Sequence, residues 1–239
     1  MTTFRFWAAC LVAVVVLIES TTAHMALLYP MPRGGIRDKK QYDAEVHAFV
    51  NFNKHRTMPC NGYNKMGPVT KLKAGQTLNV RFWGPALKGS NLDHLPAKPT
   101  GSKQINQARH GGGFCEFSLS YDGGKTFHKI GQYTKSCPDF YYEWPVKIPA
   151  NVPSCNTPGK CLFVWSWTAV NVPQFYINCA DVTIAGVKGG KLPSKSIQVV
   201  DIPNHKQKVT AQGDGYDEKM GKGPIKNEVN DNMSGKFQK

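Results

Sequence analysis

The stretch CEFSLSYDGGKTFHKI, residues 115–130, decides the fold class. Apolar and polar residues alternate along both of its arms, as they do in β-strands that turn one face toward a core. Asp122-Gly123-Gly124 lies between the arms, and glycine supplies the backbone conformations that a tight hairpin turn requires. The stretch therefore predicts an antiparallel β-hairpin.

Three more segments are rich in β-forming residues, the first of them with the same alternation, and they extend the prediction to the whole body of the chain. These are residues 76–84, 160–170 and 174–184, with a turn at 171–173 between the last two. Short strands, many Gly and Pro residues, and no long amphipathic helix indicate an all-β protein, an immunoglobulin/fibronectin-like β-sandwich with long surface loops. Residues 91–109 lack strand signals and are expected to form one such loop.

The N-terminal segment has the features of a signal peptide. Arg5 precedes an almost wholly apolar run at residues 6–18, and Thr21-Thr22-Ala23 provides small residues for cleavage after Ala23. A membrane-spanning helix needs about 20 apolar residues, so this run is too short, and no second run of that length follows. We expect residues 1–23 to be removed and a secreted protein, without a membrane segment, to begin at His24.

Export determines how the cysteines are interpreted. The sequence has seven, of which Cys10 lies in the leader and six remain. In an oxidising compartment an even number predicts up to three disulfides, among fifteen possible pairings. No CxxC or CxxH pair is present, which disfavours a zinc site.

The composition changes near residue 187. All Trp residues of the mature chain precede it, whereas residues 188–239 keep only Tyr216 and Phe237 as aromatics and are rich in Lys, Gly, Asp and Asn. We predict one domain at residues 24–187 and a low-complexity, disordered tail at 188–239. The tail also contains a glycosylation sequon at Asn232.

The net charge of +14 could favour an anionic partner. However, the basic residues are scattered along the chain instead of forming a dense run, and the leader directs the protein out of the cell. Nucleic acid is therefore not expected as a partner.

Two histidines and two residues of the last strand stand out as candidates for chemistry. His24 would become the N-terminal residue, and His110 lies in QARHGGGFCEF, where three glycines let the backbone turn closely. Tyr176 and Gln174 are two residues apart in a strand and therefore share one face. Taken singly, His110 could be an ordinary loop residue and Tyr176 a core aromatic.

Together, these motifs resemble those of a known family. An N-terminal His24, the sequence ARHGGGFC followed by SLSYDGGKTF, and the late strand QFYINCADV are similar to the lytic polysaccharide monooxygenases, particularly their fungal chitin- and cellulose-active branches. The resemblance runs from His24 to about Ile184. It implies a copper-dependent enzyme.

The resemblance also implies roles for individual residues. His24 would bind one copper ion through its α-amine and a ring nitrogen, His110 would supply a third nitrogen, and Tyr176 would occupy the axial position. Ala108 resembles the small residue on the opposite axial side. Gln174 resembles the hydrogen-bonding group that orients an activated oxygen species.

The implied reaction is oxidation of C1 or C4 of a β-1,4-linked polysaccharide, with an external electron donor and O2 or H2O2 as co-substrate. The expected substrate is an insoluble polysaccharide, with chitin slightly ahead of cellulose, although Gln174 is more typical of the cellulose-active branch. The expected enzyme is a monomer. A glycoside hydrolase would need two carboxylates across a cleft, and no such pair is evident.

An alternative remains open at this point: a non-catalytic copper-binding or polysaccharide-binding protein on the same fold. Tyr176 and Gln174 favour the enzyme. The resemblance and the expected proximity of the strands also suggest disulfide pairings, namely Cys60 with Cys179, Cys115 with Cys137, and Cys155 with Cys161.

Overall fold

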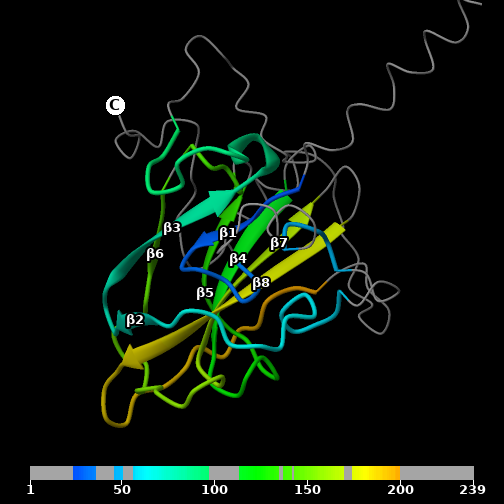
Figure 1. Cartoon of the computed structure of the whole chain (residues 1–239). Coiled ribbons are helices and arrows are strands. Elements are labelled where there is room, and N and C mark those ends of the chain that lie inside the picture. The colour runs from blue at the N-terminus through cyan, green and yellow to red at the C-terminus, as the bar shows by residue number, and fades with distance from the viewer. Residues whose placement is uncertain are drawn as a thin grey trace, which may run out of the picture.

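The computed structural model describes residues 24–35, 46–50, 56–96, 113–134, 137–141, 143–169 and 174–199. Within these residues the chain forms eight strands and one short 3-10 helix, η3 at Pro85–Leu87 (Figure 1). The strands are β1 (Ala26–Tyr29), β2 (Thr70–Lys73), β3 (Thr77–Trp83), β4 (Gly113–Ser120), β5 (His128–Thr134), β6 (Trp144–Lys147), β7 (Leu162–Ala169) and β8 (Gln174–Ala185).

The strands form two sheets that pack as a sandwich, which confirms the predicted all-β fold. One sheet has the order β1-β3-β6, and the other has the order β2-β8-β7-β4-β5. All neighbouring pairs are antiparallel except β2 and β8, which run parallel. The long strand β8 crosses much of the molecule in Figure 1 and carries the candidate residues Gln174 and Tyr176 at its beginning.

Aromatic side chains fill the space between the two sheets. Phe82 of β3 meets Trp165 of β7 with ring centroids 5.0 Å apart, and Tyr133 of β5 meets Trp144 of β6 at 5.1 Å. All eight residues of β7 are buried. Alternate residues of β7 point to opposite faces, so the outer face of the five-stranded sheet must also be covered.

Segments outside the sandwich provide that cover. A second apolar cluster contains Leu162 and Val164 of β7, and three residues from other segments pack on it: Val50, Cys60 and Ile197. The outer face is therefore part of the interior, which explains why a strand near the centre of this sheet is apolar throughout.

Residues 188–199 correct the predicted domain boundary. The backbone N–H of Lys129 donates to the carbonyl of Lys195 at 2.7 Å, and the N–H of Gln198 donates to the Glu116 carboxylate at 2.6 Å. Glu116 also forms an ion pair with Lys129 at 2.7 Å. Composition placed the boundary after Val187 because the segment is polar, but its backbone hydrogen bonds and the buried Ile197 join it to the domain.

The sequence identified some strands and missed others. The segments at 76–84, 115–130, 160–170 and 174–184 correspond to β3, the β4–β5 hairpin, β7 and β8. The missed strands β1, β2 and β6 have four residues each. So short a strand contains too few residues to establish an alternating pattern, and three of the four residues of β1 are buried.

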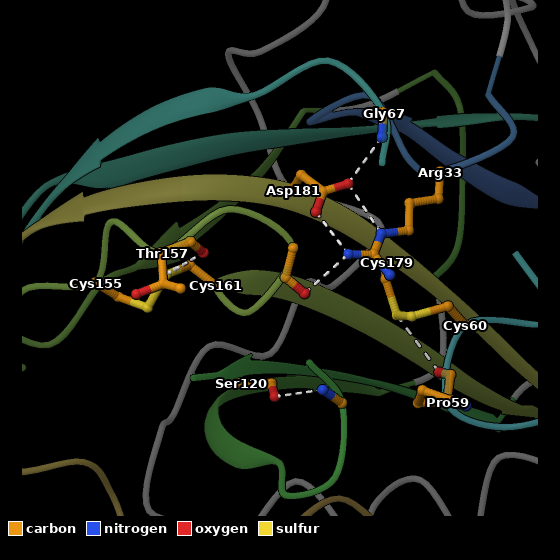
Figure 2. Close-up of polar contacts among 12 residues, drawn as sticks. Arg33, Pro59, Cys60, Gly67, Ser120, Cys155, Thr157, Cys161, Cys179 and Asp181 are labelled. Carbon is orange, nitrogen blue, oxygen red and sulfur yellow. Dashed lines mark hydrogen bonds and ion pairs between the residues drawn. A yellow bond between two sulfur atoms is a disulfide. The ribbon is translucent and has the colours of Figure 1, made fainter. Parts of the chain in front are cut away.

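Three disulfides close the fold, and they are the pairings that the family resemblance suggested. Cys60 bonds to Cys179 of β8 across 119 residues of sequence, Cys115 to Cys137 across 22, and Cys155 to Cys161 across 6. Figure 2 shows the first and third of them. Cys60–Cys179 closes a long loop, which in the chain-entropy description stabilises the folded state by roughly 4–5 kcal/mol.

Some expectations concern residues outside the described ranges. These are the signal peptide at 1–23, most of the expected loop at 91–109, and residues 200–239 with the Asn232 sequon. Among the residues that are described, no helix has the length and apolar character needed to cross a membrane.

Candidate metal centre

His24 lies just before β1 and is half-buried among aromatic rings. Its imidazole is stacked on Phe49, with ring centroids 6.3 Å apart and planes 14° from parallel. The ring centroid of His47 lies at 5.5 Å and that of Tyr176 at 6.0 Å. The structure therefore brings His24 and Tyr176, which are 152 positions apart in the chain, to one place.

The neighbouring residue, Met25, anchors this end of the chain. Its side chain is buried, and a Cβ atom added to Gly84 would come within 2.8 Å of the Met25 sulfur. Real Cβ atoms do not approach so closely, so glycine at position 84 makes room for Met25. His24 is thereby attached to a residue that the core holds firmly.

Tyr176 and Gln174 form a hydrogen-bonded pair on the inner face of β8. The Tyr176 hydroxyl donates to Oε1 of Gln174 at 2.5 Å, and the Tyr176 ring stacks on Trp167 with centroids 4.6 Å apart. Burial raises the pKa of the Tyr176 phenol well above its usual range. The phenol therefore remains protonated at physiological pH, with its orientation set by Gln174.

Asn178 connects the segments that surround His24. Its Oδ1 accepts the backbone N–H of Leu27 at 2.8 Å, and its Nδ2 donates to the carbonyl of Val46 at 3.0 Å. Asn178 is buried and lies on the same face of β8 as Tyr176. One side chain thus fixes both β1 and the segment 46–50, which carries His47 and Phe49, against the strand that carries Tyr176.

An ion pair fixes the chain beyond β1 to the same strand (Figure 2). The Arg33 guanidinium donates to both carboxylate oxygens of Asp181, at 2.9 and 2.7 Å. The Asp181 carboxylate also accepts the backbone N–H of Gly67 at 2.8 Å, and Arg33 donates to the carbonyl of Gly159 at 3.1 Å. Arg33 and Asp181 are both buried, so this bidentate ion pair is shielded from solvent.

Sequence reasoning did not single out His47 or Asn178. The ring centroid of His47 lies 5.5 Å from that of His24 and 5.5 Å from that of Trp83. Nothing in the local sequence marks His47. An asparagine within the apolar strand QFYINCADV was a usable signal, because a buried amide needs hydrogen-bond partners.

Two of the predicted residues, Ala108 and His110, lie outside the described residues, so the structure does not bear on their placement. Within the described part of the chain, no three His, Cys, Asp or Glu side chains come together as a metal site. His24, Tyr176 and Gln174 are the predicted site residues that the structure does bring together.

Comparison with known proteins gives one informative relative. No family model matches the chain. A protein of Aspergillus fumigatus (strain CBS 144.89 / FGSC A1163 / CEA10), named AA11 family lytic polysaccharide monooxygenase A, is 33% identical over 175 residues, which are 70% of this chain and 67% of that protein. The chain belongs to the lytic polysaccharide monooxygenases.

Membership of this family decides between the alternatives that the sequence left open. Lytic polysaccharide monooxygenases are copper-dependent oxidoreductases, so the chain is a polysaccharide monooxygenase and not merely a binding protein.

Among solved structures, the extended catalytic domain of H. jecorina LPMO9A, also called EG4, is 15% identical with a TM-score of 0.43, over 78% of this chain and 81% of that one.

Proposed function

We propose that this lytic polysaccharide monooxygenase is secreted, begins at His24 after removal of residues 1–23, and oxidises C1 or C4 of a β-1,4-linked polysaccharide. The α-amine and a ring nitrogen of His24 and a ring nitrogen of His110 would hold one copper ion, with the Tyr176 phenol beside it. The convergence of His24 and Tyr176, with ring centroids 6.0 Å apart, carries this proposal.

The donor groups suit copper. Imidazole and amine nitrogens are good ligands for this metal, and carboxylates, which would favour harder ions, are not part of the proposed set. Copper, when bound, supplies the redox chemistry, with an external electron donor and O2 or H2O2 as co-substrate.

The chain's own residues hold and orient this centre. Phe49 stacks on the His24 imidazole, and Asn178 fixes the backbone that follows it, so the imidazole is restrained from two sides. Gln174 accepts the hydrogen bond of the Tyr176 hydroxyl and keeps that proton in place. Trp167 stacks on Tyr176 and so closes the inner side of the site. Ala108 would leave room opposite Tyr176.

For the substrate we place insoluble chitin slightly ahead of cellulose, because the sequence motifs resemble those of chitin-active proteins. Gln174 is the feature that favours cellulose. We further propose that the enzyme acts as a monomer and that nucleic acid and membranes are not its partners.

Mass spectrometry of soluble products tests this function. Copper-loaded enzyme with a reductant and O2 or H2O2 is incubated with chitin, cellulose, xylan, pectin and starch. We expect oxidised chito-oligosaccharides, with none from copper-free enzyme or from a His110→Ala variant, whereas a His94→Ala variant, altered at an exposed histidine, should be fully active. Oxidised cello-oligosaccharides alone would transfer the assignment to cellulose, and the absence of oxidised product from every polysaccharide would contradict the proposal.

A further inference from the structure

Five exposed lysines gather at one end of the sandwich. They come from three segments that are far apart in the sequence: β2, the end of β6, and the loop that follows β8. Among the described residues, none of their ammonium groups has an ion-pair or hydrogen-bond partner. We call this group the lysine end, and it consists of Lys71, Lys73, Lys147, Lys188 and Lys191.

Backbone pairing brings the strands of the lysine end together. In the parallel pair of β2 and β8, Lys73 is the register partner of Ala185, the last residue of β8. Figure 1 shows these two strands ending side by side. Just beyond β2, the N–H of Gly75 donates to the carbonyl of Ile148 at 3.0 Å, and Ile148 directly follows Lys147. The ends of β2, β6 and β8 therefore lie together.

The loop after β8 is packed against the segment 151–153. The N–H of Lys191 donates to the carbonyl of Asn151 at 2.8 Å. A Cβ atom added to Gly190 would lie only 2.4 Å from that carbonyl oxygen, so glycine at this position lets the two backbones touch. Lys188 and Lys191 thus project from a loop that its backbone contacts hold beside the other lysines.

Little negative charge is available to neutralise the lysine end. Asp122 lies in the neighbouring hairpin turn, and its carboxylate accepts hydrogen bonds from within that turn. Asp181 of β8 is paired with Arg33. The segments that form the lysine end contain no Asp or Glu, at residues 70–76, 147–155 and 185–191. The five ammonium groups therefore produce a local excess of positive charge, which attracts an anionic partner.

The residue types in these three segments favour an acidic polysaccharide over nucleic acid or a membrane. The segments contain no Arg, the residue whose planar guanidinium pairs with phosphate through two hydrogen bonds. They also contain no Phe, Trp or Tyr that could stack on a nucleic-acid base or enter a lipid headgroup layer. Carboxylates spaced along a sugar polymer require only point charges, which lysine supplies.

We propose that the lysine end binds a polyuronate, an anionic polysaccharide whose carboxylates pair with the lysine ammonium groups. The choice of a polysaccharide as the polyanion rests on the proposed function. β8 has 12 residues and leads from Gln174 beside His24 to Ala185 at the lysine end. At about 3.3 Å per residue, the two places lie up to roughly 36 Å apart.

This separation lets the two ends of the molecule act on different polymers. An acidic polymer bound at the lysine end leaves the His24 region free for a neutral polysaccharide. In material that contains both polymers, the first contact raises the effective concentration of the enzyme at the second. The lysine end is thus an attachment surface, separate from the residues that would hold copper.

Calorimetric titration of copper-free mature protein with polygalacturonate tests the lysine end. Binding should weaken as salt rises from about 50 to 200 mM, and Lys73→Gln combined with Lys191→Gln should weaken it by about tenfold or more. Lys88→Gln combined with Lys195→Gln removes the same charge from exposed lysines elsewhere and should leave the affinity within about twofold of the parent. Equal losses in the two double variants, or no loss in the first, would overturn the proposal.

The same assay separates a polyuronate from other ligands. At equal concentration of negative charge, single-stranded DNA and phosphatidylserine vesicles should bind more weakly than polygalacturonate, because the lysine end offers no aromatic ring to either. Tighter binding of DNA or of the vesicles would overturn the assignment to an acidic polysaccharide. Chitohexaose should not displace polygalacturonate, and displacement would show that the polyanion binds at the site of the neutral substrate instead.

A second measurement uses the unaltered protein and so does not depend on the folding of any variant. Backbone amide NMR signals of Ala74, Gly189 and Lys191 should shift on titration with tri-galacturonate, whereas that of Lys88 should not. No shift at the first three residues would contradict the proposal. Since no copper is present, the outcome is independent of oxidation, and failure of the proposed function would appear only in the product analysis.

Discussion

The hairpin turn between β4 and β5 and the surroundings of His24 are organised in opposite ways. In the turn, the Asp122 carboxylate accepts hydrogen bonds from Ser120, Lys125 and Thr126, all within four residues of it. Around His24, the contacts that matter join residues separated by 132 to 151 positions, as in Asn178 with Val46 and Leu27.

The difference determines how each region responds to change. Contacts between near neighbours close small loops, so the turn can form from its own sequence. The His24 region exists only when β1, the segment 46–50 and β8 have all assembled, because no one of these segments contains its contacts. A perturbation of the turn should therefore remain local, whereas a perturbation of the long-range contacts should reach the metal centre.

The largest effect is expected from breaking the buried ion pair that holds residue 33 to β8. Asp181→Ala leaves the Arg33 guanidinium buried without its partner, which should lower the free energy of unfolding by about 3–5 kcal/mol. Urea denaturation measures this, and Asp93→Ala, which changes an exposed carboxylate, should stay within about 0.5 kcal/mol of the parent. A loss below about 1 kcal/mol for Asp181→Ala would show that the long-range contacts do not carry the stability assigned to them.

A smaller loss of stability, with an effect on metal binding, is expected at Asn178. Asn178→Ala leaves the Leu27 N–H and the Val46 carbonyl without this partner, at a cost of about 2–3 kcal/mol in the free energy of unfolding. Copper affinity should also fall, although Asn178 is not a proposed ligand. The reason is that the segments that carry His24 and His47 would no longer be hydrogen-bonded to the same side chain of β8. The exposed Asn151 provides the control, and Asn151→Ala should change neither quantity.

If Asn178→Ala lowers stability but leaves copper affinity unchanged, other contacts hold the His24 region. The region would then depend less on the long-range hydrogen bonds of Asn178 than its contrast with the hairpin turn requires. Chelator competition measures the affinity on both variants under the same conditions.

The smallest effect is expected in the hairpin turn. Burial works against ionisation of Asp122, but hydrogen bonds from Thr126, Ser120 and Lys125 outweigh it and lower the pKa of the carboxyl to about 2. A lowered pKa in the folded state stabilises it above the unfolded value, near 4, and this contribution is lost as the pH falls from about 4 to 2. Asp122→Ala should cost about 1 kcal/mol at pH 7 and leave copper affinity unchanged.

Chemical-shift titration of the Asp122 carboxyl checks the pKa directly. A midpoint for Asp122 near 4 would mean that the turn's hydrogen bonds do not favour the charged form. A loss of copper affinity in Asp122→Ala would contradict the separation between the two regions.

The sequence predicted the local features of the fold well. The hairpin follows from alternation and a turn that lie close together, β7 and β8 follow from β-rich runs separated by a turn, and the all-β class follows from these segments. β1 and the order of the strands could not be predicted in this way. β1 is short, and its position depends on Asn178 and Arg33, whose partners lie more than a hundred residues away.

The candidate site followed from a resemblance, not from local physics. His24, His110, Tyr176 and Gln174 lie in three distant segments, and no periodicity connects them. His47 was missed because its significance comes only from proximity to His24. The boundary after Val187 was placed too early because polar composition does not reveal backbone hydrogen bonds such as that between Lys129 and Lys195.

Copper titration of three forms of the protein tests the central claim, that a processed N-terminus at His24 forms the metal centre. The mature chain should bind one copper ion. A form with one extra glycine before His24 and a His110→Ala variant should each lose at least about 100-fold in affinity, because each lacks a proposed ligand. A His94→Ala variant should bind as the mature chain does. Equal copper affinity in all of these forms would contradict the account.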